Sequence, residues 1–279
     1  MNRNELGKRI PLEGTINTRD LGGYKTKDGR SIKFKRIIRT DCLSHVTKKD
    51  IEYIQNILNA KIEIDMRGFR ELREEPNKEM PFLKFYHLPI QEELEEGLDM
   101  NPHTHFEVED KDINGTIEYL FRMDKNGDIT TSFEKNYRNM LKPFGQKQYA
   151  RFLHICQKNK EGSILFHCAD GKDRSGLAAA ILLLALGVDE ETVLIDYLKT
   201  NENTKEKAEK REDYLRNICH IQDETVIQSI KTIAGVRKNW MEAAFDEMKK
   251  QAGSIDSFLE NNLNLSKEDR KELQDNYLN

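Results

Sequence analysis

The 279-residue chain has few of the residues that mark secreted, disulfide-bonded proteins. It contains one tryptophan, six prolines and only four cysteines, which are Cys42, Cys156, Cys168 and Cys219. No two of these cysteines form a Cys-x-x-Cys pair. Their spacing favours free thiols in a reducing compartment, although four cysteines would also allow two disulfides.

Long apolar runs are also scarce. The first seven residues lack the apolar stretch of a secretory signal, and the strongest apolar run, residues 177–186, is too short to cross a bilayer. We therefore predict no integral membrane segment, and we read the 177–186 run as a buried helix. A cytoplasmic location is predicted, and a secreted form whose signal peptide has been removed stays open.

The charge balance excludes a broad basic surface. The net charge is −4, with 37% hydrophobic and 34% charged residues, which is a soluble globular composition. This balance argues against nucleic acid as a partner, so the attraction of an anionic ligand would need a local basic pocket.

The most informative segment of the chain is residues 167–176, which read HCADGKDRSG. It lies between a strand-like run at 163–166 and the apolar run that begins at Leu177. A loop that leads from a strand into a helix offers unpaired backbone N–H groups and the positive end of the helix dipole to an anion. Its two glycines let the backbone curl around the ligand. The segment therefore predicts a phosphate site.

Cys168 and Arg174 are separated by five residues within this loop. At this spacing a thiolate can attack a phosphorus atom while the guanidinium holds two of its oxygens. The helix N-terminus, Arg174 and His167 would favour the thiolate form. Ser175 could hydrogen-bond the sulfur when it leaves. We therefore predict a phosphocysteine intermediate and neither a metal nor an organic cofactor.

The segment resembles the Cys-x5-Arg signature of protein tyrosine and dual-specificity phosphatases, in the form found in a bacterial subgroup of tyrosine and lipid phosphatases. Residues 17–24 (NTRDLGGY) and Asp65-Met66-Arg67 with Glu71 resemble two further motifs of this subgroup, and weaker similarities lie at 39–44 and 196–201. The resemblance spans residues 17 to about 201. It implies an α/β fold with a mainly parallel central sheet flanked by helices, and a loop at the carboxyl end of a strand.

The resemblance also suggests roles for side chains. Asp173 matches a loop aspartate implicated as general acid in related phosphatases, with Asp170 as the alternative, and a loop-bracing role for Asp173 stays open. For Arg19, Asp20 and Arg67 we favour a supporting network of buried charges over direct contact with substrate. The remaining residues of the predicted phosphate-binding loop are Ala169, Asp170, Gly171, Lys172 and Ser175.

Three functions fit these residues. The first is a phosphatase acting on phosphotyrosine proteins, with dual specificity for phosphoserine and phosphothreonine left open. The second is a phosphoinositide or inositol-phosphate phosphatase, in which Lys172 would bind a second phosphate. The third is a module that binds phosphorylated partners without turnover, and the intact Cys168, Arg174 and Ser175 argue against it.

The pattern along the chain predicts strands at 32–39, 61–66, 82–90 and 163–167. Helices are expected at 51–58, where Thr47 to Asp50 resembles a capping box, at 133–140, at 146–157 and over most of the last hundred residues. We expect one phosphatase domain over 1–279. Within it, residues 91–131 read as an insertion and the charged segment 200–235 as solvated helices or a lid over the site.

Two patterns in the insertion imitate metal sites. Residues 110–115 copy the first half of an EF-hand loop, but Phe121 stands where that loop needs a glutamate. His103 and His105 could chelate a metal, yet no third ligand is evident nearby. We therefore predict no metal site.

Overall fold

A computed structural model of the chain describes residues 6–92 and 129–279. Its centre is a five-stranded sheet with the order β1-β2-β5-β3-β4. Only β1 is antiparallel, and it pairs with β2. The predicted α/β class with a mainly parallel sheet is therefore confirmed. The strands are β1 (Arg19–Asp20), β2 (Ile37–Thr40), β3 (Ala60–Asp65), β4 (Lys84–His87) and β5 (Ser163–His167).

The strand register places the carboxyl ends of β2, β3 and β5 side by side. The last residue of β5, His167, lies opposite both Thr40, the last residue of β2, and Asp65, the last residue of β3. In a parallel sheet, ligands bind beyond the carboxyl ends of the strands. The loop that follows His167 begins at this edge.

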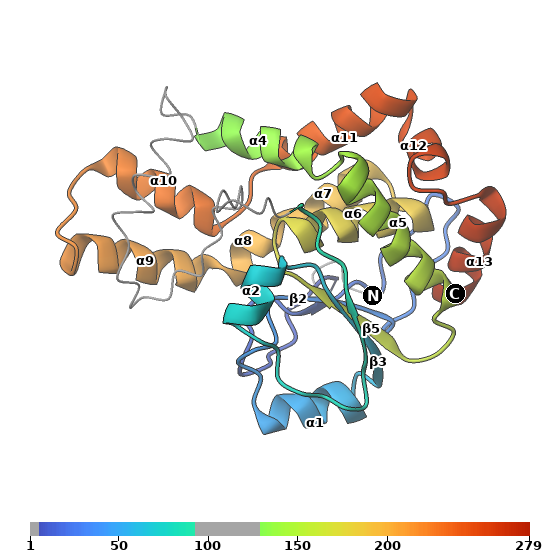
Figure 1. The fold of residues 1–279 in the computed structure, drawn as a ribbon, viewed down its shortest axis with the longest axis horizontal. Coiled ribbons are helices and arrows are strands. Elements are labelled where there is room, and N and C mark those ends of the chain that lie inside the picture. Colours follow the sequence, from blue (N-terminus) through green and yellow to red (C-terminus); the bar gives the residue numbers. More distant parts are fainter. Residues whose placement is uncertain (1–5, 93–128) are drawn as a thin grey trace.

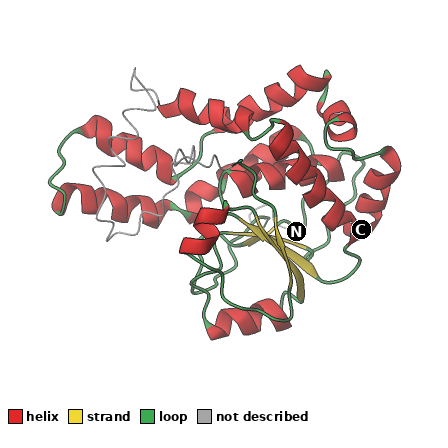
Figure 2. Ribbon diagram, in the orientation of Figure 1, coloured by secondary structure: helices red, strands yellow, loops and turns green. Residues whose placement is uncertain are grey.

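Helices cover both faces of the sheet, with α1 on one side and α5 and α6 on the other (Figures 1 and 2). Alternate strand residues explain this division. Ile38 and Leu165 pack with the apolar residues of α1, whereas Ile37 and Phe166 belong to the larger core. The described helices are α1 (Lys48–Asn56), α2 (Phe69–Glu74), α4 (Ile129–Asn139), α5 (Pro143–Lys158), α6 (Arg174–Leu186), α7 (Glu190–Leu198), α8 (Thr200–Asn203), α9 (Lys205–Asn217), α10 (Glu224–Ala234), α11 (Lys238–Ala252), α12 (Ile255–Asn261) and α13 (Lys267–Tyr277).

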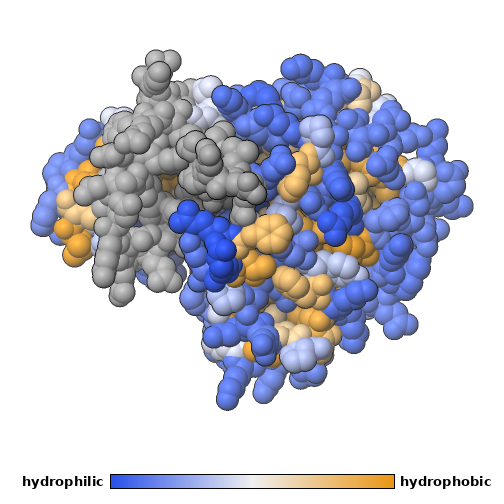
Figure 3. All heavy atoms as spheres, in the orientation of Figure 1, coloured by the Kyte–Doolittle hydropathy of each residue, from blue (hydrophilic) through white to orange (hydrophobic). Residues whose placement is uncertain are grey.

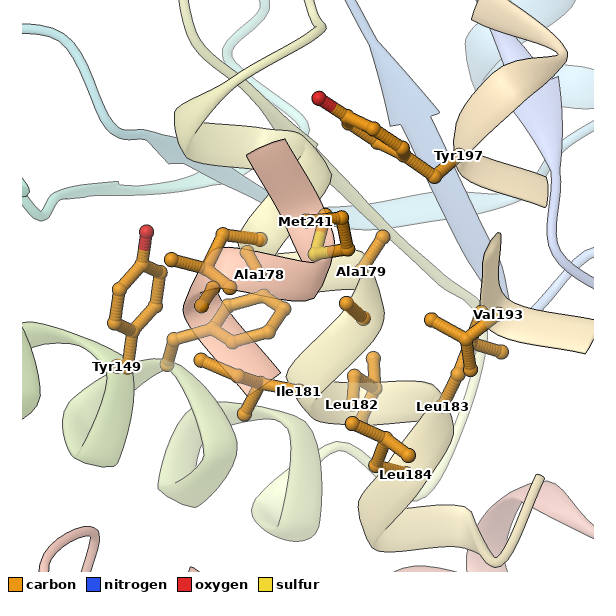
Figure 4. Packing of buried hydrophobic residues seen from close by; sticks show 14 of the residues in the cluster. Tyr149, Ala178, Ala179, Ile181, Leu182, Leu183, Leu184, Val193, Tyr197 and Met241 are labelled. Atoms are coloured by element: carbon orange, nitrogen blue, oxygen red, sulfur yellow. The ribbon is translucent and has the colours of Figure 1, made fainter. Parts of the chain in front are cut away.

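The apolar run 177–186 forms most of α6, and every residue of this helix is buried. Figure 4 shows its side chains packed among Tyr149, Val193 and Met241 from three other helices. A helix that is apolar on all sides is stable only when it is surrounded. α6 ends at Gly187, whose φ of +96° suits glycine. The predicted buried helix behind the loop is confirmed, and its burial fixes the position of the loop.

Most predicted elements are present with shifted ends. The strand at 163–167 and the Thr47–Asp50 capping box are as predicted. The strand expected at 32–39 begins only at Ile37, because residues 34–35 form a turn in which Lys35 has a φ of +56°. The strand expected at 82–90 is confined to β4. The helix expected from 146 begins at Pro143, since proline lacks only an N–H that the first helical turn leaves unbonded.

The predicted insertion at 91–131 lies mostly outside the described residues. The EF-hand-like pattern at 110–121 and both His103 and His105 fall there as well. Among the described residues, no group of three or more His, Cys, Asp or Glu side chains could hold a metal ion. Within 6–92 and 129–279, no helix combines the length and the apolar character needed to cross a membrane.

Candidate active site

The loop between β5 and α6, residues 168–175, is named here the Cys-Arg loop. Cys168 lies at its start and is 2% exposed. The Cys168 sulfur lies 3.4 Å from the Ser175 hydroxyl in the first turn of α6. The predicted nucleophile and the predicted partner of its sulfur are thus in contact at the N-terminus of a buried helix.

Two backbone carbonyls of the Cys-Arg loop accept hydrogen bonds from side chains that lie outside the loop. The Asn17 side-chain amide and the Arg39 Nε both donate to the Gly171 carbonyl, each at 2.9 Å. Arg39 also donates to the Lys172 carbonyl at 3.0 Å. In a trans peptide, the C=O and the next N–H point in opposite directions. Holding these carbonyls outward therefore turns the following N–H groups toward the inside of the loop, where an anion would be bound.

Gly171 is required by this geometry. Its φ is +65°, in the left-handed region that residues with a Cβ rarely adopt. A Cβ built on Gly171 would also lie 2.6 Å from the Thr40 carbonyl oxygen. The close approach of the loop to β2 therefore needs glycine.

Arg19 and Arg39 share one buried carboxylate. Arg19 Nε lies 3.1 Å and Arg39 Nη1 3.4 Å from the Asp196 carboxylate, and the three side chains are almost fully buried. Burial alone would raise the pKa of Asp196, but the two guanidinium groups outweigh burial and lower it. Arg19 also donates to Asn17. Arg19 therefore acts on the loop through Asn17, which fits the predicted supporting role.

Asp20 lies farther from this chemistry. Its carboxylate accepts hydrogen bonds from the backbone N–H groups of Gly22 and Lys35, at 2.8 and 2.7 Å. These contacts brace the turn after β1. The structure gives Asp20 no contact with the Cys-Arg loop among the described hydrogen bonds.

Arg67 and His167 belong to a second buried network, below the start of the loop. Arg67 binds the Asp65 carboxylate through two nitrogens, and His167 Nε2 lies 3.4 Å from Glu63 and 3.8 Å from Asp65. Burial alone would lower the pKa of His167, but Asp65 and Glu63 raise it above its ordinary value of 6.5. These contacts tie the end of β5 to β3.

This pairing predicts how stability depends on pH. A group with a raised pKa in the folded state contributes stability below its unfolded pKa and loses it as pH rises through the folded pKa. The free energy of unfolding of the wild type should therefore fall as pH increases above 6.5. Urea unfolding from about pH 6 to about pH 8.5 measures this slope. His167→Gln should flatten it, and an equal slope in the two proteins would contradict the assignment.

Arg174, at the first position of α6, forms a bidentate ion pair with Glu71. Its two terminal nitrogens lie 2.5 and 2.7 Å from the two carboxylate oxygens. Glu71 is itself fixed, since it accepts from the backbone N–H of Gly68 at the start of α2. Burial would lower the pKa of Arg174, but Glu71 raises it, so the guanidinium stays charged. Glu71 thus orients the predicted phosphate-binding cation, a role that its place in a motif alone did not reveal.

Asp173 lies just before α6 and is 2% exposed. The Tyr137 hydroxyl of α4 donates to its carboxylate at 2.9 Å, and the Tyr197 hydroxyl lies 2.5 Å from that of Tyr137. Burial raises the pKa of both tyrosines, which keeps them protonated as donors. No sequence pattern had linked α4 to the loop.

Lys172 differs from the expectation that it would lie ready for a second phosphate. Its side chain is 1% exposed and its ammonium donates to the Ile233 carbonyl of α10. The ammonium also lies 3.8 Å from the Asp173 carboxylate. Burying a cation costs free energy unless it is hydrogen-bonded and paired, and these two contacts meet that need. Only its backbone belongs to the wall of the loop.

Asp170 faces the charged segment 200–235, for which solvated helices or a lid were predicted. Its carboxylate pairs with Lys207 of α9 at 2.6 Å. Together with the Lys172 contact to α10, this ion pair fastens the antiparallel helices α9 and α10 beside the Cys-Arg loop (Figure 1). The segment 200–235 therefore packs beside the Cys-Arg loop.

These elements match a known family. The model of the tyrosine phosphatase family matches residues 10–279, so the chain belongs to that family. A Cupriavidus necator protein named "putative tyrosine-protein phosphatase" is 26% identical over 272 residues, which are 96% of this chain and 88% of that protein. The triple specificity protein phosphatase PtpB of Mycobacterium tuberculosis is 26% identical over 102 residues, which are 34% of this chain and 37% of PtpB.

Proposed function

We propose that this protein hydrolyses phosphomonoesters through a phosphocysteine intermediate and without a metal, acting on phosphotyrosine proteins. One arrangement carries the proposal. Cys168 begins a loop whose carbonyls are bonded outward, and Arg174 is held at the other end of the same loop by Glu71. A thiolate, a bidentate cation and inward N–H groups are the parts needed to stabilise a phosphoryl group in transfer.

The proposed reaction has two steps. The Cys168 thiolate forms a bond to phosphorus while the phosphorus–oxygen bond of the ester breaks, and Asp173 gives its proton to the leaving oxygen. A water molecule then attacks the phosphorus of the phosphocysteine, Asp173 takes a proton from it, and the phosphorus–sulfur bond breaks. Ser175, 3.4 Å from the sulfur, would hydrogen-bond the departing thiolate.

A comparison of substrates tests this proposal. The purified protein is assayed for phosphate release from para-nitrophenyl phosphate, from peptides phosphorylated on tyrosine, serine or threonine, and from phosphoinositides. We expect the tyrosine peptides to be preferred, and comparable rates on serine and threonine peptides would add dual specificity. Absence of turnover on every substrate, with phosphopeptide binding retained, would favour the binding module.

The phosphoinositide alternative predicts a specific effect at Lys172. Because the ammonium is buried and bonded to Ile233, we expect Lys172→Ala to lower kcat/KM for phosphotyrosine peptides and multiply phosphorylated inositol lipids by similar factors. A loss at least about 10-fold larger on the lipids, about 1.4 kcal/mol of selective binding, would instead support a second phosphate at this lysine. Thermal unfolding of the variant separates either result from a loss of folded protein.

We also propose that α9 and α10 act as a cover of the site. The Asp170–Lys207 ion pair and the Lys172 contact with Ile233 join this helix pair to the loop itself. A phosphorylated substrate that entered the loop would place its negative charge beside the Asp170 carboxylate. The repulsion between the two would weaken the link from Asp170 to α9. Lys207→Ala should therefore change KM more than kcat.

A further inference from the structure

A second concave surface lies away from the Cys-Arg loop, between α5, the β3–β4 edge of the sheet and the segment that joins α12 to α13. It is a groove of about 790 Å³. Its apolar lining includes Ile62, Tyr86, Ala150, Ile155 and Leu263. On the face drawn in Figure 3, apolar surface lies between hydrophilic side chains in the region of β4 and α5. We refer to this surface as the α5 groove.

The rim of the α5 groove is basic. Lys147, Arg151, His154 and Lys158 line it from α5, and all four are exposed. They recur at intervals of four, three and four residues, so they share one face of the helix. Lys84 adds a cation from β4, where its ammonium lies 5.0 Å above the Tyr86 ring.

The lysine and arginine charges of this rim are not neutralised locally, whereas His154 interacts electrostatically with Asp269 of α13. No Asp or Glu is among the described residues that line the groove. No ion pair within 4.0 Å joins Lys84, Lys147, Arg151 or Lys158 to a carboxylate in the part of the chain that the structure describes. In a protein with net charge −4, such a run of uncompensated cations attracts an anionic ligand.

The spacing of the cations selects the shape of that ligand. From residue 147 to residue 158 the helix rises about 16 Å, and each four-residue step is about 6 Å. Alternate side chains of an extended peptide repeat at about 6.6 Å. A compact phosphate would meet only one or two of these cations, whereas an extended acidic peptide could meet several. Its other side chains would face the apolar lining of the groove.

The same geometry disfavours a membrane as the partner. Binding to a lipid surface relies on apolar side chains that protrude into the lipid, but the apolar residues here line a recess and Leu263 is 2% exposed. We therefore propose that the α5 groove binds an extended peptide segment in which acidic and apolar residues alternate, contributed by a protein partner. This binding does not depend on the chemistry at Cys168.

Fluorescence anisotropy with the full chain tests the proposal. The probe is a fluorescein-labelled octapeptide that alternates glutamate and leucine, and the matched peptide carries lysine in place of glutamate. We expect the glutamate peptide alone to bind, and its affinity to fall as salt screens the charges. Lys147→Glu combined with Arg151→Glu should weaken binding by about 10-fold or more.

Two controls make the result specific. Lys27→Glu combined with Lys48→Glu makes the same change in charge at exposed positions outside the groove and should leave the affinity within about 2-fold of the wild type. Ala150→Trp fills the groove without changing charge and should weaken binding as much as the charge reversal. Circular dichroism verifies that each variant is folded.

Several outcomes would overturn the proposal. Failure of the glutamate peptide to bind the wild type is one, and equal losses in the two double variants is another. Unchanged affinity of Ala150→Trp would mean that the peptide meets the charges without occupying the groove. Capture of the protein by phosphatidylserine vesicles but not by the peptide would identify a lipid surface as the partner.

Discussion

Replacing Cys168 by Ser is expected to remove turnover of para-nitrophenyl phosphate by several orders of magnitude. The hydroxyl of serine is a far weaker acid than a thiol, so the loop that would stabilise a thiolate leaves an alcohol protonated and poorly nucleophilic. The fold should persist, since sulfur and oxygen differ little in size and the Ser175 contact can be kept. Phosphate release and circular dichroism measure the two effects.

The control for this substitution is Cys219→Ser, which changes a less buried thiol outside the loop and should leave turnover unaltered. Activity of the wild type should also persist in EDTA. Wild-type rates in the Cys168→Ser protein would show that the sulfur is not the nucleophile. Loss of activity on chelation, restored by a divalent cation, would point to a metal mechanism instead.

The position of Cys168 could be predicted because the information is local. A strand-like run, a short loop with two glycines and an apolar run follow one another within residues 163–186, and α6 is buried on all sides as that apolar run requires. The same holds for the Thr47 capping box, whose two hydrogen bonds lie within four residues. Local patterns of this kind predicted the start of the site, whereas the mainly parallel sheet was predicted from the family resemblance.

The contacts that shape the loop could not be predicted in the same way. Asn17 and Arg39 reach Gly171 across more than 130 residues of sequence, and Tyr137 reaches Asp173 from a helix with no recognisable motif. Such contacts are created by the packing of the sheet and α4, not by local preference. The resemblance located Arg39 and Glu71 in motifs, but only their contacts show that Arg39 holds the loop carbonyls and that Glu71 orients Arg174.

Lys172 shows why a residue type alone misleads. A lysine in a phosphate-binding loop suggests a second anion, yet its ammonium is bonded to Ile233 and lies near Asp173. The helix α10 that supplies this carbonyl is 61 residues farther along the chain. Once α10 packs against the loop, bonding the ammonium internally costs less free energy than leaving it buried and unbonded.

Asp173→Asn should slow substrates with poor leaving groups by about 10²–10⁴-fold, while para-nitrophenyl phosphate should lose much less. The leaving oxygen of a tyrosine or serine phosphate is a strong base and needs a proton, whereas the para-nitrophenolate ion is stable without one. Asparagine keeps an oxygen that can accept from Tyr137, whose hydroxyl lies 2.9 Å from Asp173. The substitution therefore removes the proton donor and leaves the hydrogen bond in place.

A bracing role for Asp173 predicts a different pattern. The carboxylate lies at the N-terminus of α6 and 3.8 Å from the Lys172 ammonium. Asparagine would therefore destabilise the helix and the loop, and activity would fall by the same factor on every substrate. Comparable losses of kcat on phenyl phosphate and para-nitrophenyl phosphate, with a lower melting temperature, would assign that role. Asp170→Asn, measured in parallel, should show no leaving-group dependence, because Asp170 is paired with Lys207 of α9; dependence at Asp170 alone would make it the general acid.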